Sequence, residues 1–165
     1  MESERTSRRS IRLTEYDYSL AGMYFVTVVA QLKLCLFGHV TNEKMVLNDA
    51  GNMIMNSWLE IPNRYPYVVC DVFIVMPNHL HGILCFENEY PEKPLSLVIG
   101  SFKSLTTVSY IHGVEQYKWD VFQKRLWQRN YYEHIIRNEE SLNNIRDYIL
   151  YNPTHWNTDT DNPLL

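Results

Sequence analysis

The sequence predicts a single α+β domain in which helices cover an antiparallel sheet. A chain of 165 residues fits one domain and is too short for two ordinary ones. Hydrophobic residues make up 45% of it and charged residues 21%, proportions that are typical of a chain with a packed core. Paired strand patterns alternate with single helix patterns, which favours a sandwich of the ferredoxin-like or split βαβ kind.

Three strand patterns and one helix pattern occupy the first half of the chain. The first strand pattern is rich in β-branched and aromatic residues, and the other two flank Asn42 and Glu43. In the helix pattern, apolar residues recur at helical spacing between a polar N-cap and a proline. The predicted elements are a strand over Tyr24 to Val29, hairpin strands over Leu36 to Val40 and Lys44 to Leu47, and a helix from Asn48 to Pro62.

The second half repeats the pattern of paired strands followed by a helix. Two strongly apolar strands are separated only by a short turn that contains Pro77, so we expect them to pair antiparallel. A helix then opens at a proline and ends before a glycine, and the last helix begins at an asparagine cap. The predicted elements are strands over Val68 to Met76 and Leu80 to Phe86, a helix from Pro94 to Gly113, a short strand near Val121 to Trp127, and a helix from Asn138 to Asn152.

The domain is predicted to cover residues 1–165, with a basic N-terminal arm over 1–14 and a C-terminal tail over 154–165. The net charge of −4 does not suggest a nucleic-acid partner, but the basic residues are unevenly distributed. Five basic residues stand against two acidic ones from Ser101 to Asn130, and Arg8, Arg9 and Arg12 cluster in the arm. An ordinary solvated surface is the plainer explanation of both clusters.

Cysteine usage and hydropathy predict a soluble cytoplasmic protein. Cys35, Cys70 and Cys85 are odd in number and form no CxxC motif, which indicates reduced thiols. The longest nearly apolar run, Ala21 to Ala30, is far shorter than the roughly 20 residues that cross a bilayer. No apolar segment of a secretory signal follows the basic N-terminus. We therefore expect no membrane association.

The sharpest motif is a pair of histidines, His79 and His81, at the start of a predicted strand. Residues i and i+2 of a strand share one face, so the two imidazoles lie side by side. Two neighbouring neutral imidazoles on a rigid strand make half of a metal site. A pair of polar residues on a solvated sheet face is the alternative, and an isolated HxH motif favours it.

A second motif places Tyr148 and Asn152 one helical turn apart near the end of the last helix. A tyrosine hydroxyl can act as a nucleophile, and an amide oxygen is a hard ligand for Mg²⁺ or Mn²⁺. The alternatives are a half-buried packing tyrosine and an ordinary asparagine at a helix end before proline. Tyr131, Tyr132 and Tyr151 are other candidate nucleophiles, but only Tyr148 has the one-turn relation to Asn152.

Together these motifs resemble those of the REP-associated tyrosine transposases, which belong to the HUH superfamily of single-strand DNA transposases. The resemblance implies a fold of the HUH endonuclease type. It also implies that His79, His81 and Asn152 hold one divalent ion, Mg²⁺ or Mn²⁺, and that Tyr148 is the nucleophile. The implied substrate is single-stranded DNA folded into a hairpin, cleaved through a 5′-phosphotyrosine. The matching segments are Arg9 to Arg12, Tyr24 to Thr27, Val75 to Gly82, Trp127 to Arg137 and Tyr148 to Pro153.

Basic residues near the motifs are candidates for DNA contacts. If Lys124 to Gln128 forms a strand, Arg125, Trp127 and Arg129 share a face and offer phosphate contacts beside a stacking surface. Core packing is the alternative role for Trp127. The full set of candidate DNA-binding residues is Arg8, Arg9, Arg12, Lys103, Lys124, Arg125 and Arg129.

Two rival functions remain open from the sequence. One is a non-catalytic regulator that binds hairpin or single-stranded nucleic acid, although the intact motifs speak against a simple loss of activity. The other is a metal hydrolase with water as nucleophile, but no Asp or Glu accompanies the histidines at motif spacing. The sequence fixes neither the target DNA nor the choice between a monomer and a homodimer.

Overall fold

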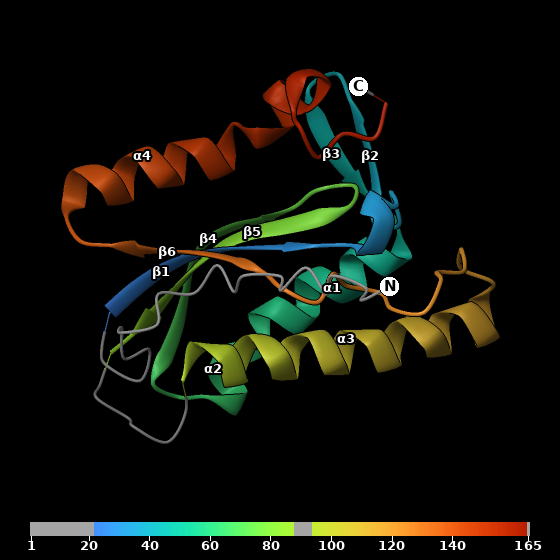
Figure 1. Cartoon of the computed structure of the whole chain (residues 1–165), viewed down its shortest axis with the longest axis horizontal. Coiled ribbons are helices and arrows are strands. Elements are labelled where there is room, and N and C mark those ends of the chain that lie inside the picture. Colours follow the sequence, from blue (N-terminus) through green and yellow to red (C-terminus); the bar gives the residue numbers. More distant parts are fainter. Residues whose placement is uncertain (1–21, 88–93, 165) are drawn as a thin grey trace, which may run out of the picture.

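The fold is built on one four-stranded antiparallel sheet, seen in a computed structural model that describes residues 22–87 and 94–164 (Figure 1). In space the strands follow the order β4-β5-β1-β6, so β5 and β1 are central. This arrangement is that of a split βαβ fold, and it confirms the predicted α+β class with an antiparallel sheet. The strands are β1 (Gly22–Val29), β4 (Val68–Val75), β5 (His79–Phe86) and β6 (Tyr132–Ile136).

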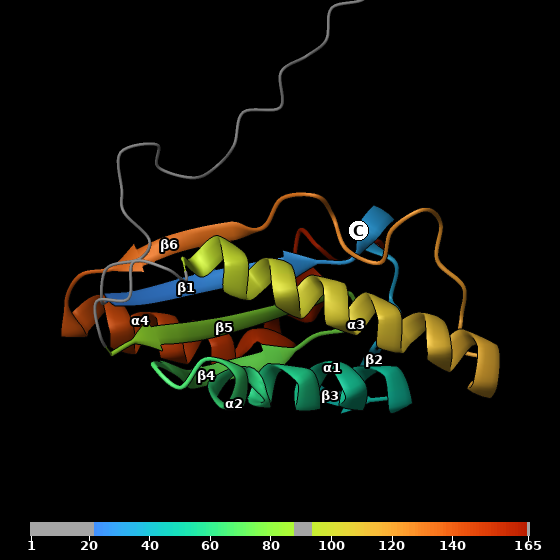
Figure 2. The same ribbon diagram turned by 90° about the horizontal axis from the view of Figure 1, so that it is seen from below.

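Three helices cover one face of the sheet and a fourth covers the other (Figures 1 and 2). The first face carries the larger core, in which Tyr24 and Val26 of β1 pack with Trp58 and Phe102. The helices on this side are α1 (Asp49–Leu59), the short α2 (Ile61–Arg64) and α3 (Leu95–Tyr117). Most of the apolar burial that stabilises the fold therefore lies below the sheet in the view of Figure 1.

The opposite face of the sheet is covered by α4 (Glu139–Leu150) over a smaller apolar cluster. Successive residues of a strand point to opposite faces, so Phe25 of β1 and Ile83 of β5 lie here rather than in the larger core. Leu142 and Ile149 of α4 complete the contact. Asn138 caps this helix by accepting a hydrogen bond from the Ser141 amide at 2.8 Å.

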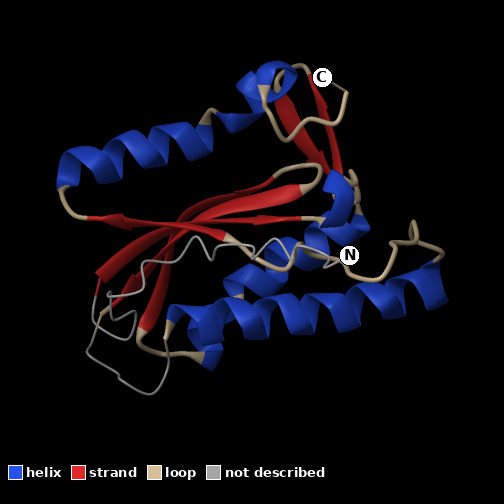
Figure 3. Ribbon diagram, in the orientation of Figure 1, coloured by secondary structure: helices blue, strands red, loops and turns tan. Residues whose placement is uncertain are grey.

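A two-stranded hairpin stands outside the main sheet, beside the C-terminal segment (Figure 3). Its strands are β2 (Gly38–Thr41) and β3 (Lys44–Leu47), which confirms the predicted hairpin. Both turn residues, Asn42 and Glu43, have positive φ angles of 49° and 59°, as a type I′ turn requires. The remaining elements are two short 3₁₀ helices, η1 (Gln31–Lys33) and η2 (Asn152–Thr158).

The predicted strand over Val121 to Trp127 is wrong, and the fourth strand of the sheet is β6. The segment before β6 makes only an isolated bridge between Trp127 and Ala30. Lys124 has a φ of 62°, which interrupts any extended geometry. Leu126 and Trp127 are buried although the chain is irregular here, whereas Val121 is exposed. A local strand pattern does not distinguish such a buried irregular segment from a strand.

Three helix ends also differ from the prediction. α1 ends at Leu59, and Pro62, the predicted stop, lies in the separate helix α2. α3 continues past Gly113 to Tyr117 and ends where Lys118 adopts a left-handed φ of 56°. α4 ends at Leu150, so Asn152 belongs to η2 rather than to the helix that carries Tyr148. Within the described ranges, no helix is long and apolar enough to span a membrane. Arg8, Arg9 and Arg12 lie outside the described residues.

Candidate active site

Two buried histidines form the centre of the candidate site. His79 is the first residue of β5 and His81 the third, so both side chains point to the face that α4 covers. His79 is fully buried, His81 is 4% exposed, and the Phe25 ring stacks on His81 with a centroid distance of 5.6 Å. The alternative of two polar residues on a solvated sheet face is therefore wrong.

The two imidazoles face one another through their Nε2 atoms. Their Nε2 atoms are 3.0 Å apart. Each opposite nitrogen has a protein partner: His79 Nδ1 lies 2.7 Å from Asn78 Oδ1, and His81 Nδ1 lies 2.7 Å from Thr27 Oγ1. Thr27 stands directly across from His81 in the pairing of β1 with β5, so the sheet register itself places the hydroxyl. The two Nε2 atoms thus converge on one point.

The surroundings keep both histidines neutral. Burial lowers the pKa of His79, and the nearby carboxylates of Asp161 and Asp159 offset this only in part. Burial also lowers the pKa of His81, and the adjacent His79 adds to the effect. Neutral imidazole is the form that binds metal ions, so the ring nitrogens at the site are suited to ligation at neutral pH.

Tyr148 of α4 and Asn152 of η2 approach these histidines from the covering layer. The Tyr148 ring lies 5.3 Å from the His81 ring and 6.0 Å from Phe25, and the residue is 49% exposed. Partial burial raises the pKa of Tyr148, the Asp159 carboxylate raises it further, and a hydrogen bond with Asn152 lowers it in part. The hydroxyl therefore remains protonated at neutral pH while its side chain stays accessible to a substrate.

The other candidate tyrosines differ in position. Tyr131 is buried in the larger core, on the far side of the sheet from the histidines. Tyr132 pairs with Thr27 and lies on the histidine face, where its ring is 6.0 Å from Phe25. Tyr151 follows the end of α4 and is 60% exposed. The structure thus brings Tyr148 and Tyr132 to the site, but not Tyr131.

The donor atoms at the site fit a divalent cation. Asn152 is 2% exposed, and its Oδ1 atom accepts no hydrogen bond from the described part of the chain. A buried acceptor without a partner costs free energy, which a bound cation would recover. No third His, Cys, Asp or Glu gathers with the two histidines within residues 22–87 and 94–164. The available set is therefore two imidazole nitrogens and one amide oxygen.

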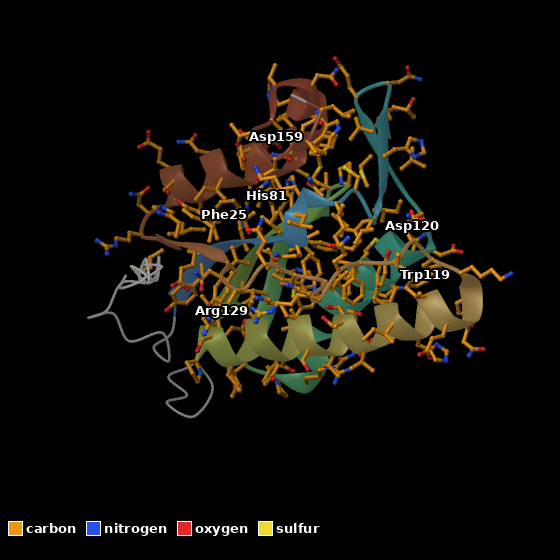
Figure 4. All side chains as sticks on the ribbon, turned by 45° about the vertical axis from the view of Figure 1, so that its right-hand side comes forward. Phe25, His81, Trp119, Asp120, Arg129 and Asp159 are labelled. Carbon is orange, nitrogen blue, oxygen red and sulfur yellow. The ribbon has the colours of Figure 1, made fainter. Side chains whose placement is uncertain are left out.

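The C-terminal segment forms part of the site wall, which sequence reasoning missed by treating 154–165 as a tail. The Trp156 ring lies 6.1 Å from the His79 ring. Asn78 Nδ2 donates to the Asp161 carbonyl at 2.6 Å, and Lys33 forms an ion pair with the Asp161 carboxylate at 3.1 Å. Figure 4 shows Asp159 above His81 on the same side of the sheet. A tryptophan in a polar tail was the available signal, since large aromatic residues are usually buried.

One ion pair fixes α4 on the sheet. Arg146 donates from Nε to Asp71 Oδ1 at 2.9 Å and from Nη2 to Asp71 Oδ2 at 2.5 Å, a bidentate arrangement. Asp71 lies where the pairing of β4 with β5 shifts register between Cys70 and Phe73. Such an irregularity redirects a side chain, and here the carboxylate contacts the helix that carries Tyr148.

The four predicted DNA-binding residues within the described chain line one groove of about 380 Å³ between α3 and the segment before β6. Three of them are exposed. The fourth, Lys103, donates from Nζ to the carbonyls of Gln128 and Arg129 at 2.7 and 3.0 Å. In Figure 4 Arg129 lies beside α3, on the other side of the sheet from Asp159. The groove residues are Lys103, Lys124, Arg125 and Arg129.

Trp127 belongs to the core and offers no stacking surface. It is 3% exposed, and its Nε1 donates to Thr106 Oγ1 at 2.9 Å. The predicted alternation of Arg125, Trp127 and Arg129 on one strand face is wrong, because no strand forms there. The core-packing alternative for Trp127 is confirmed.

Fold and site together define an α+β protein whose central sheet presents a histidine pair to a tyrosine on the covering helix. The family model described as "Transposase IS200 like" matches residues 36–152, a range that contains His79, His81, Tyr148 and Asn152. The chain therefore belongs to the IS200-like transposase family, and the resemblance found from its motifs is confirmed.

Two relatives from Haemophilus influenzae extend the comparison. One, named only as an uncharacterized protein, is 40% identical over 92% of this chain and 91% of its own length. The other is named as a REP-associated tyrosine transposase and is 28% identical over 83% of this chain and 73% of its own length. Among solved structures, a REP-associated tyrosine transposase bound to a REP hairpin matches with a TM-score of 0.59 and 22% identity, over 86% of this chain and 73% of that one. This last likeness supports the shared fold.

Proposed function

We propose that the protein is a REP-associated transposase that cuts and rejoins single-stranded DNA beside a hairpin, with Tyr148 as the nucleophile. The observation that carries the proposal is the convergence of Tyr148 and Asn152 on the paired Nε2 atoms of His79 and His81. Family membership supports the reaction class, and the name of one relative supports the kind of DNA.

The chemistry is an exchange of one phosphodiester for another. Tyr148 Oη attacks phosphorus, its bond to phosphorus forms as the bond from phosphorus to the 3′ oxygen breaks, and a 5′-phosphotyrosine results. The tyrosine proton is released and the departing 3′ oxygen takes up a proton, so the step is balanced. A 3′-hydroxyl from another strand then reverses the reaction and frees the tyrosine. No nucleotide hydrolysis is required.

His79, His81 and Asn152 are the residues that would hold a divalent cation, Mg²⁺ or Mn²⁺. Such a cation would polarise the scissile phosphate and stabilise the charge that develops on its oxygens. Imidazole ligands favour Mn²⁺ over Mg²⁺. The neutral histidines and the buried Asn152 side chain support this assignment, because all three residues are desolvated and Asn152 is close enough to His79 to influence its pKa.

The groove beside α3 is the proposed contact for the DNA backbone. Three exposed basic side chains line it, those of Lys124, Arg125 and Arg129. Lys103 donates a hydrogen bond to a carbonyl of the segment that carries them. The solved relative bound to a REP hairpin supports a hairpin as the partner. The arginines of the N-terminal arm, Arg8, Arg9 and Arg12, remain predicted contacts. Binding through phosphates weakens as salt concentration rises.

The decisive experiment is a comparison of Tyr148→Phe with Tyr132→Phe. Both tyrosines are 49% exposed and lie 6.0 Å from Phe25, so the two variants are matched in burial and setting. Each protein is incubated with metal and a 3′-labelled hairpin oligonucleotide, then run on a denaturing gel. The parent and Tyr132→Phe should form a protein–DNA adduct, whereas Tyr148→Phe should bind the hairpin yet form none.

The outcomes separate the rival functions. An adduct that persists in Tyr148→Phe and disappears in Tyr132→Phe would mean that the nucleophile is Tyr132. Cleavage without any adduct would favour a metal hydrolase that uses water. Hairpin binding without cleavage or adduct, over a range of hairpins, would favour a non-catalytic regulator.

A further inference from the structure

The amide of Asn78 holds His79 in one tautomer. Asn78 is fully buried, and its Nδ2 atom donates to the Lys33 carbonyl at 2.9 Å and the Asp161 carbonyl at 2.6 Å. Both amide protons are thus in use, which fixes the orientation of the side chain. Its Oδ1 atom therefore faces His79 Nδ1, and an amide oxygen can only accept. His79 must carry its proton on Nδ1 and present a bare Nε2.

This assignment determines the tautomer of His81 when no cation is bound. His79 Nε2 has no proton, so the 3.0 Å contact between the Nε2 atoms is a hydrogen bond only if His81 Nε2 donates. A neutral His81 that carries its proton on Nε2 has a bare Nδ1. The Thr27 hydroxyl, 2.7 Å away, then donates to that nitrogen. Every buried donor and acceptor in this chain of contacts is satisfied.

A cation held by both histidines requires the opposite tautomer of His81, because Nε2 must then offer a lone pair. We propose that Thr27 is a positioning residue whose hydroxyl supports both tautomers, donating to His81 Nδ1 without a cation and accepting from it when one is held. The proton moves from Nε2 to Nδ1 of one ring, so no net proton is gained or lost. Only a group that both donates and accepts can fill this role. The inference rests on the proposed cation site.

The location of Thr27 supports its role as a switchable partner. Thr27 is paired with His81 in the sheet register and is 7% exposed, so water does not readily replace its hydroxyl. Rotation about the bond from Cβ to Oγ1 is enough to exchange donation for acceptance. Asn78 has no such freedom, because its amide is fixed by two carbonyls. The two histidines therefore differ: the tautomer of His79 is fixed, whereas that of His81 changes when a cation is held.

Nitrogen NMR of the histidine rings tests the assignment directly, without any measurement of activity. Zn²⁺ is a suitable probe because it is diamagnetic and binds imidazole well. In the metal-free protein we expect the proton on Nδ1 of His79 and on Nε2 of His81. On addition of Zn²⁺, His81 should change to the Nδ1 tautomer while His79 remains the same. A metal-free His81 with its proton on Nδ1, or a change at His79, would overturn the inference.

Three variants test the role of the hydroxyl by calorimetric titration with Zn²⁺. Thr27→Val keeps the shape and removes the hydroxyl, so Zn²⁺ affinity should fall by about 10- to 100-fold. Thr27→Ser should restore most of it. Thr106→Val is the matched control, since it also removes a buried hydroxyl that contacts a ring nitrogen, that of Trp127. It should lower thermal stability and leave Zn²⁺ affinity unchanged.

The results distinguish failure of this inference from failure of the proposed function. If the parent protein does not bind Zn²⁺ or Mn²⁺, the cation site itself is refuted. If the parent binds Zn²⁺ and Thr27→Val binds it equally well, the role of Thr27 is refuted while the site stands. Should Thr27→Val not fold, the ring tautomers of the parent and the affinity of Thr27→Ser still decide the question.

Discussion

Gly82, the residue after His81, is a position in β5 where one added methyl group has no room. On the face opposite the histidines, a Cβ at Gly82 would lie 2.4 Å from Cζ2 and 3.0 Å from Cε2 of Trp58. Carbon atoms in contact are normally about 3.5–4.0 Å apart, so the closest pair would have to separate by about 1 Å. Trp58 is fully buried and its ring contacts Phe73 and Phe102, so it cannot move freely.

Such overpacking usually costs about 1–3 kcal/mol of stability. For a protein of this size that corresponds to a fall in Tm of about 2–12 °C for Gly82→Ala. Gly100 in α3 is the matched control, because a Cβ there meets no atom within 4 Å. Gly100→Ala should instead raise stability by about 0.5–1 kcal/mol, since alanine loses less conformational entropy in a helix. The free energy of unfolding should thus fall in Gly82→Ala and rise in Gly100→Ala.

The assay is urea unfolding followed by tryptophan fluorescence, together with a double-mutant cycle. Trp58→Phe removes the ring atoms that the new Cβ approaches, so Gly82→Ala should cost less in that background than in the parent. A Gly82→Ala protein as stable as Gly100→Ala would refute the argument. So would two substitutions whose costs simply add, because the clash would then not involve Trp58.

Three further predictions concern the ion pair of α4, the groove and the cation site. Hydrogen bonding from Arg146 lowers the pKa of Asp71, so the stability from this pair is present above the ordinary carboxyl pKa and is lost as pH falls through the lowered value. Asp71→Asn should therefore unfold at lower temperature than the parent at pH 7, and the thermal melts of the two proteins should converge only when the pH has fallen below the lowered pKa of Asp71. Lys124→Ala and Arg125→Ala should each flatten the plot of log affinity for single-stranded DNA against log salt by about 0.7, measured by filter binding. Asn152→Ala should lower Mn²⁺ affinity and cleavage together and leave hairpin binding intact in a gel shift; undiminished cleavage in excess EDTA would contradict this.

Elements with a clear apolar period were predictable from sequence. The helix expected from Asn48 to Pro62 forms as α1, which ends at Leu59, and Pro62 instead lies at the start of the short α2. The strand expected over Leu80 to Phe86 forms as β5 with one additional residue. The spacing of His79 and His81 placed both on one face because side chains alternate along a strand. Such predictions succeed because the information is local.

Features that depend on distant segments were not predictable. Thr27 and His81 are 54 positions apart, and Asn78 and Asp161 are 83 apart, so no local pattern joins them. The strand expected over Val121 to Trp127 failed for a related reason. Leu126 and Trp127 are buried in the larger core, and burial alone does not determine backbone conformation.

The two faces of the sheet carry unequal amounts of apolar packing, and this difference has a consequence for how the site opens. α4 is held by the small cluster around Phe25 and Ile83 and by one ion pair, whereas the histidines are on a central strand of the sheet. Regions with little buried apolar surface open locally at free energies below that of global unfolding. Amide hydrogens of α4 should therefore exchange with solvent before those of β5. Tyr148 can then leave the histidine pair and return while the sheet stays folded.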